Sequence, residues 1–394
     1  MPHDTRLIAT LAAAFVLAFA FGFAATRVRL PPLVGYLVAG VLIGPFTPGF
    51  VGDIGLAGQL AEIGVILLMF GVGLHFSVQD LMAVRRIAIP GAIGQIATAT
   101  AIGAAMTAYW GWSPGAGLVF GLSLSVASTV VLLRALEQRH ALQSPEGRIA
   151  IGWLIVEDLA MVLALVLLPV LAQALGTLPG DDGTAGDPAR AGLLLAFGVT
   201  ILKVALFVGL ALVVGTRVVP WLLMQVARTG SRELFTLAVL ATALGIAYGS
   251  AALFDVSFAL GAFFAGVILS ESELSHKAGA DSLPLQDAFA VLFFVSVGML
   301  FDPSILLREP LAVLAVLAVI VVGKSLAAFL IVLAFGYPVR TALLVSASLA
   351  QIGEFSFILA GLGIALGLLP QEGRDLILAG ALLSITLNPL TFAG

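Results

Sequence analysis

The sequence predicts an all-α polytopic membrane protein, and three observations carry that prediction. Of the 394 residues, 61% are hydrophobic and only 10% are charged, whereas a soluble domain carries about a quarter charged residues. The apolar runs are long and continuous, without the alternation of polar and apolar residues that is typical of barrel strands. Because every backbone group must find a partner within lipid, the remaining architecture is a bundle of helices.

Polar residues, prolines and glycines divide the chain into about thirteen spans of roughly 20 residues each. The second and the ninth span are short for a full crossing. We assign all of them to one transmembrane transport domain that covers residues 1–394. The predicted spans are about 7–26, 31–46, 55–74, 87–110, 114–136, 148–172, 191–214, 234–251, 256–270, 285–301, 306–335, 338–367 and 372–394.

Basic residues are unevenly distributed between the two sets of connections. Twelve lie in one set, and four lie in the other set together with the N-terminus. Because basic residues gather in cytoplasmic connections, the N-terminus is expected outside and the C-terminus in the cytoplasm of a bacterial inner membrane. The twelve are Arg27, Arg29, Arg85, Arg86, Arg134, Arg139, Arg148, Arg217, Arg228, Arg232, Lys277 and Arg340.

The two halves of the chain repeat one another. GYLVAGV (35–41) recurs as GAFFAGV (261–267) at a shift of 226 positions. LSVASTVVLL (124–133) lies over LAQIGEFSFI (349–358) at a shift of 225. A nearly constant shift over several spans is hard to obtain by chance, even in so apolar a chain.

The shift spans seven helices, an odd number, so the two repeats have inverted topology. Repeat one covers about residues 7–172, a linker helix covers about 191–214, and repeat two covers about 234–394. Inverted repeats are typical of secondary transporters, which bind their substrate near the midplane where helices are broken.

Polar clusters at matching positions predict crossed, discontinuous helices in the fifth and twelfth spans. Ser128 and Thr129 lie in one cluster, and Gln351 and Glu354 lie in the other. Serine and threonine also occur in unbroken membrane helices, bonded to the carbonyl four residues back. Two clusters at corresponding positions favour breaks, and we expect these four residues to coordinate a cation. The alternative for Glu354 is that it only bonds backbone groups freed by the break.

Five charged residues lie deep in predicted spans, where ionisable groups are costly and usually functional. Glu354 is one of them, and Lys203, in the linker helix, is expected to be structural. Glu157 and Asp158 lie near the midplane of the sixth span, and Lys324 lies at the centre of the eleventh. Adjacent residues point about 100° apart on a helix. We therefore expect one carboxylate to pair with Lys324 and the other to face a water-filled cavity. The alternative for Lys324 is that it neutralises the carbonyl end of a broken helix.

An accessible carboxylate at this depth can hold a proton or a small cation, and this competition is the chemistry of cation/proton exchange. We predict a monovalent cation site at Asp158. The exchange needs no covalent chemistry, so we expect no enzyme activity, no catalytic residues and no cofactor, only transported K⁺ or Na⁺ and H⁺. The small net charge of -4 suggests no nucleic-acid partner, and the absence of cysteine excludes disulfides.

The ordered motifs of this chain resemble the monovalent cation:proton antiporter-2 family, particularly its Kef-type potassium/proton antiporters. These motifs are LPPLVGYLVAGVLIGP (30–45), LAEIGVILLMFGVGLHF (60–76), SVASTVVLLRAL (125–136), VEDLAMV (156–162), FFVSVGM (293–299), GKS (323–325) and AQIGEFSF (350–357). The resemblance covers the whole chain. It implies a sodium/proton antiporter-like fold and a homodimer in the lipid bilayer, with a core domain that moves against a dimerisation domain.

Carried over by residue, the resemblance makes Asp158 the ion-binding aspartate and Lys324 the basic partner of the preceding position. Glu157 departs from the pattern, because relatives carry Asp, Asn or Gln there. Kef-type members continue into a cytoplasmic nucleotide-binding regulatory domain, but no G-x-G-x-x-G opens a helix after a strand in this chain. We expect either a member without that domain or a chain in which the domain follows the C-terminus.

The predicted function is an antiporter that exchanges a monovalent cation, K⁺ rather than Na⁺, for H⁺ by alternating access. One alternative is a gated cation channel on the same scaffold, which needs a continuous pore, often lined by carbonyl rings. The sequence holds no TVGYG-like filter, and one compact acidic site favours a carrier. A second alternative is a symporter of organic anions, and the acidic site argues against it.

Overall fold

The structure is a computed structural model that describes residues 5–74, 78–142, 144–174, 198–199, 202–254, 256–270 and 272–391. Every regular element in these ranges is a helix. Repeat one holds α1 Arg6–Arg27, α2 Pro32–Ile43, α3 Ile54–Leu74, α4 Val78–Tyr109, α5 Pro114–Ser125, α6 Thr129–Gln138 and α7 Pro145–Ala174. The linker holds η1 Ala211–Gly215 and α9 Thr216–Ala227.

Repeat two reproduces the same order of helices. Its π-helical segment η2 lies inside the helix that corresponds to α4, between α14 and α15. The helices of repeat two are α10 Arg232–Phe254, α11 Phe258–Ser270, α12 Ser275–Met299, α13 Ile305–Arg308, α14 Pro310–Ala318, η2 Val319–Gly323, α15 Lys324–Ala334, α16 Val339–Ser348, α17 Glu354–Ala365 and α18 Gln371–Thr391.

Each predicted span has a helical counterpart in the described residues, but three boundaries were wrong. Helix α4 begins at Val78 rather than 87, and α12 begins at Ser275 rather than 285. The linker helix continues to Ala227 instead of ending at 214, and most of its predicted first half lies outside the described residues. Charged or polar residues interrupt all three extensions, and composition marks where lipid ends and not where a helix ends.

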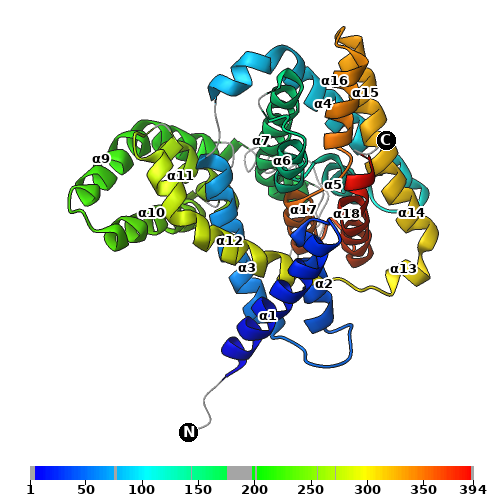
Figure 1. Cartoon of the computed structure of the whole chain (residues 1–394), viewed down its shortest axis with the longest axis horizontal. Coiled ribbons are helices and arrows are strands. Elements are labelled where there is room, and N and C mark those ends of the chain that lie inside the picture. The colour runs from blue at the N-terminus through cyan, green and yellow to red at the C-terminus, as the bar shows by residue number, and fades with distance from the viewer. Residues whose placement is uncertain are drawn as a thin grey trace, which may run out of the picture.

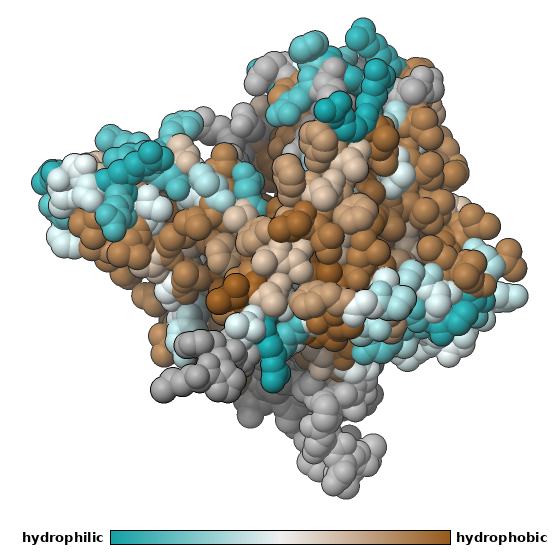
Figure 2. Space-filling view, turned by 60° about the horizontal axis from the view of Figure 1, so that its bottom comes forward, coloured by the Kyte–Doolittle hydropathy of each residue, from teal (hydrophilic) through white to brown (hydrophobic). Residues whose placement is uncertain are grey.

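The chain has the helices of a multi-pass membrane protein. Eight helices in the described residues are long and apolar enough to cross a bilayer. The predicted short pair is confirmed, since α2 has 12 residues and α11 has 13. Figure 2 shows apolar side chains over the middle of one face, with hydrophilic ones gathered toward its margins. Such an apolar belt matches a surface solvated by lipid.

The inverted repeat is visible as one helix crossing that occurs twice. At the crossing of α2 with α12, a Cβ added to Gly40 would overlap the Val295 carbonyl oxygen and lie 2.8 Å from the Gly298 Cα. At the crossing of α11 with α3, a Cβ added to Gly266 would overlap the Phe70 carbonyl oxygen. Gly40 and Gly266 are 226 positions apart. The same backbone approach, possible only without a side chain, is therefore built in both halves.

The helices form two groups that lie side by side (Figure 1). In the first, which we call the unbroken group, α3 packs against α11 and α12, α1 packs against α2, and α10 packs against α11. In the second, the broken-helix group, α4 packs against α5, α7 and α15, and α17 packs against α5 and α18. Contacts between the groups are fewer, and include those of α7 with α11 and of α2 with α18.

Candidate functional site

Both predicted helix breaks are present, and they cross one another. Helix α5 ends at Ser125 and α6 begins at Thr129, while α16 ends at Ser348 and α17 begins at Glu354. The Ser128 backbone N–H donates to Gln351 Oε1 at 2.9 Å, and Gln351 Nε2 donates back to the Ser128 carbonyl at 3.2 Å. The side-chain amide of one break thus pairs the Ser128 N–H that the other break frees, and it adds a second donor to the Ser128 carbonyl, which also accepts from the Leu132 N–H.

Two helix N-termini converge at this crossing, and each has an oxygen beside it. Ser128 is the N-cap of α6, and its hydroxyl accepts from the Val131 N–H at 3.4 Å. The same hydroxyl donates to Glu354 Oε2 at 3.1 Å. Glu354 is the first residue of α17. A carboxylate is favoured there, because the free N–H groups of a helix N-terminus carry partial positive charge.

The adjacent acids of α7 both reach the first break. Glu157 Oε2 accepts from the Ala127 backbone N–H at 2.8 Å, and Asp158 Oδ2 accepts from the Thr129 hydroxyl at 3.3 Å. The side chains are almost fully buried, with 0% of Glu157 and 5% of Asp158 exposed. Asp158 is therefore not open to the expected water-filled cavity in this conformation.

Each of these acids keeps one oxygen without a hydrogen-bond partner among the described residues. These oxygens are Glu157 Oε1 and Asp158 Oδ1, and both are buried. A buried acceptor without a partner is rare and calls for an explanation such as a bound ion or water. Asp158 also interacts electrostatically with Glu157 and Glu354. The site therefore concentrates three carboxyl groups around the crossing.

Lys324 does not form the expected ion pair with a carboxylate. Its ammonium, 0% exposed, donates to the Gln351 carbonyl oxygen at 3.1 Å, and no ion pair of the described residues joins it to Glu157 or Asp158. Its electrostatic interaction with Glu157 acts across a longer distance. The alternative stated from the sequence matches this geometry, since the ammonium lies at a freed carbonyl just after α16, where a cation is favoured.

Sequence reasoning missed one buried side chain at the crossing, Gln95 of α4. Its Nε2 donates to the Ser125 carbonyl at 3.0 Å, at the last residue of α5, and the residue is 0% exposed. A single amide in an apolar span was the available signal, because such a side chain at membrane depth needs a partner.

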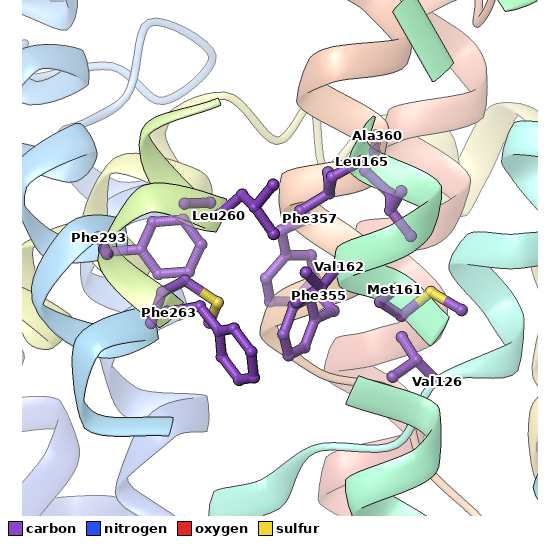
Figure 3. Packing of buried hydrophobic residues seen from close by; sticks show 14 of the residues in the cluster. Val126, Met161, Val162, Leu165, Leu260, Phe263, Phe293, Phe355, Phe357 and Ala360 are labelled. Atoms are coloured by element: carbon purple, nitrogen blue, oxygen red, sulfur yellow. The ribbon is translucent and has the colours of Figure 1, made fainter. Parts of the chain in front are cut away.

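Apolar side chains separate the acids from the unbroken group. Figure 3 shows Leu260, Phe263 and Phe293 of the unbroken group facing Phe355 and Phe357 of α17. Phe294 and Phe357 meet edge to face across the boundary, with ring centroids 6.4 Å apart. Phe355 directly follows Glu354 in the chain. The charged crossing therefore borders an interface closed by aromatic and aliphatic groups.

Inverted repeats, two crossed broken helices and buried acids at their crossing define a secondary transporter with a sodium/proton antiporter-like fold. The comparison with protein families agrees. The family model described as sodium/hydrogen exchanger, transmembrane, matches residues 11–393. The chain belongs to this family of cation/proton antiporters.

The chain is also similar to several individual proteins. It is 64% identical over 393 residues to the putative cation/proton antiporter YbaL of Escherichia coli, and spans 69% of that protein. It is 35% identical to K(+) efflux antiporter 4 of Arabidopsis thaliana over 99% of this chain and 64% of the relative. The sodium proton antiporter MjNhaP1 of Methanocaldococcus jannaschii shares the fold, with a TM-score of 0.71, 16% identity and coverage of 97% and 96% of the two chains.

Proposed function

We propose that this protein exchanges K⁺, in preference to Na⁺, for H⁺ by alternating access, with Asp158 as the group that binds both. The observation that supports this most directly is the buried Asp158 Oδ1, which has no hydrogen-bond partner among the described residues, while the Thr129 hydroxyl donates to Oδ2 of the same carboxyl group. The preference for K⁺ draws on the names of the Arabidopsis relatives, which are K(+) efflux antiporters. These relatives are longer than this chain, which spans 64% and 63% of them.

The exchange follows from competition for one carboxylate. When Asp158 is protonated it is neutral and has no strong attraction for a cation. When it is ionised, its two oxygens and the lone pairs of Thr129 Oγ1 can replace part of the hydration shell of a monovalent ion. Ser128, Gln351 and Glu354 supply further oxygens at the crossing. One cation therefore enters as a proton leaves, and the buried site alternates between two occupied states.

Movement of the broken-helix group against the unbroken group would carry this site from one side of the membrane to the other. The boundary between the groups suits such movement, because aromatic and aliphatic side chains can slide without breaking hydrogen bonds (Figure 3). The positive-inside count supports an N-terminus outside and a C-terminus in the cytoplasm. We also propose that the protein works as a homodimer in the bacterial inner membrane, without enzymatic activity or a cofactor in this chain.

Reconstituted vesicles test the proposal. With a proton gradient imposed and a pH-sensitive dye inside, added K⁺ should collapse the gradient for the unchanged protein and for Glu146→Gln, a control at the cytoplasmic start of α7. Asp158→Asn should abolish the response while the protein still elutes as one folded species. Full exchange by Asp158→Asn would refute the site, and unitary conductance steps in planar bilayers would favour the channel.

A further inference from the structure

Gln95 holds one of the freed carbonyl ends at the crossing and has no assigned role. It lies in the middle of α4, fully buried, with its Nε2 on the Ser125 carbonyl at 3.0 Å. Its Oε1 is buried without a hydrogen-bond partner among the described residues. Only one orientation of the amide suits this place, because the opposite one would set an oxygen against the carbonyl oxygen.

In the other repeat, Lys324 donates a hydrogen bond to a backbone carbonyl at the second break. Its Nζ lies 3.1 Å from the Gln351 carbonyl, and Gln351 and Ser125 are 226 positions apart, within one residue of the shift of 225 that aligns these two segments. Gln95 and Lys324 are 229 positions apart. The π-helical segment η2 lies directly before Lys324 and changes the local register of its helix. The two helices thus each deliver a donor to a backbone carbonyl at one of the two breaks, and only one of the donors is charged.

The difference in charge has a consequence for ion binding. Glu157, Asp158 and Glu354 are the acids at the crossing, and Lys324 is the one ammonium bonded to it among the described residues. A lysine at position 95 would still offer an N–H donor to the Ser125 carbonyl, as Lys324 does to the Gln351 carbonyl. It would also cancel more of the negative charge that attracts a cation, and charges act strongly where water is excluded.

We infer that Gln95 is a positioning residue of the cation site, which fixes the carbonyl end of α5 while its neutrality preserves the negative charge that a cation requires. The inference rests on the proposed function, because it assigns Gln95 to that same site. It differs from a simple capping role in one respect. The charge at position 95, and not only the hydrogen bond, sets the affinity for the cation.

The test measures cation binding and exchange separately on the purified full chain. Binding is the K⁺ or Na⁺ concentration that gives half of the maximal increase in Tm at constant ionic strength, and exchange is measured in the vesicles above. Gln95→Lys should raise the half-saturating concentration at least tenfold. Gln95→Met, which loses the hydrogen bond without changing the charge, should lower Tm but change that concentration less than about threefold. Gln95→Glu, which when ionised also loses the donor, should give a lower half-saturating concentration than Gln95→Met.

The double variant Gln95→Lys/Lys324→Gln exchanges the two donors between the repeats. It restores a single ammonium at the crossing, so its half-saturating concentration should return to within about threefold of the unchanged protein. If Gln95→Lys and Gln95→Met lost the same amount of cation affinity, and the double variant did not recover it, Gln95 would act only as a structural cap. That result would overturn the inference. Should Gln95→Lys not fold, an affinity of Gln95→Glu that is equal to or weaker than that of Gln95→Met, which also lacks the donor, would overturn it as well.

Failure of the proposed function has a different signature. If K⁺ and Na⁺ raise the Tm of the unchanged protein but drive no proton movement, the exchange function is wrong. The Tm shifts of the Gln95 variants still test the inference about cation affinity. If neither ion changes the Tm, the cation site itself is refuted, and the inference about Gln95 is refuted with it.

Discussion

The hydroxyl of Ser128 donates a hydrogen bond to the carboxyl group of Glu354 at 3.1 Å, across 226 positions of sequence. Ser128 caps α6, and Glu354 opens α17, the corresponding half-helix of the inverted repeat. The two repeats therefore meet at the start of their equivalent half-helices. One side chain satisfies a helix N-terminus in its own repeat and also holds an acid of the other repeat in place.

The double role of Ser128 predicts a split between stability and transport. Ser128→Ala should lower the free energy of unfolding by about 1–2 kcal/mol, because it removes an N-cap and a hydrogen bond to a buried acid. It should also alter the cation concentration that half-saturates exchange. Thermal unfolding in detergent and the vesicle assay measure the two effects.

Ser113→Ala is the matched control for Ser128→Ala. Ser113 caps α5 in the same way, with its hydroxyl accepting from the Ala116 N–H at 3.2 Å, but this cap lies at the opposite end of α5 from the break. We expect a loss of about 1 kcal/mol in stability and unchanged exchange. Equal changes in exchange for both variants would contradict a specific role of Ser128.

The closest approach of the two breaks predicts a strict requirement for glycine at position 353. A Cβ added there would overlap the Cα and Cβ of Ser128. Gly353→Ala should therefore cost about 1–3 kcal/mol of stability, as overpacking in a dense core does, and should reduce exchange. Gly361→Ala in the same half-helix meets open space and should be neutral or slightly stabilising, since alanine favours a helix. Similar Tm values for the two variants would contradict the crossing geometry.

The breaks could be predicted from sequence because their chemistry is local. Ser128 and Thr129 form a polar cluster inside an apolar span, and a second cluster around Gln351 lies one repeat away. Polar side chains at that depth cannot be solvated by water, so they must bond freed backbone groups or a ligand. The same reasoning located Glu157, Asp158 and Lys324, and the structure brings Glu157 and Asp158 to one break and Lys324 to the other.

The partners of these groups could not be predicted, because they are set by packing between distant helices. Lys324 bonds a backbone carbonyl, and carbonyls carry no sequence signal. Gln95 looks like a minor irregularity in an apolar helix until α5 is seen to end beside it. The start of α4 was misplaced because Arg85 and Arg86 indicate the edge of the lipid while the helix continues past them. Tertiary geometry decides each of these cases.

A surface acid outside the membrane-spanning segments gives a pH-dependent prediction. Asp302 lies between α12 and α13, where hydrogen bonds from Ser304 and the nearby Arg308 guanidinium hold the pKa of its carboxyl group below the usual value. A lowered pKa in the folded state stabilises the fold above the ordinary aspartate pKa of about 3.9, and this contribution is lost as the pH falls through the folded-state value.

The Tm difference between the unchanged protein and Asp302→Asn should therefore be largest near neutral pH and should shrink below about pH 4. Arg308→Gln should reduce the difference, because it removes the contact of 2.7 Å to Asp302 Oδ2. The effect is small because the Arg308 side chain is 60% exposed, so that solvent screens the ion pair. A difference in Tm that grows on acidification would contradict this sign.

Glu157 provides the sharpest separation of charge from hydrogen bonding within the site. Its Oε2 accepts from the Ala127 N–H at 2.8 Å inside the first break. Glu157→Gln retains an oxygen that can accept the same hydrogen bond, so folding and exchange should persist. Glu157→Gln removes one carboxyl group that could titrate or balance the charge of Lys324. The net charge moved in each transport cycle should therefore change, as measured by currents on solid-supported membranes.

Glu157→Leu, which is close in size, leaves the Ala127 N–H unpaired in a buried break. This costs about 1–3 kcal/mol of stability, and the variant should also lose exchange. If Glu157→Gln moved the same charge per cycle as the unchanged protein, Glu157 would serve the helix break alone and Asp158 would be the only titrating group of the transport cycle.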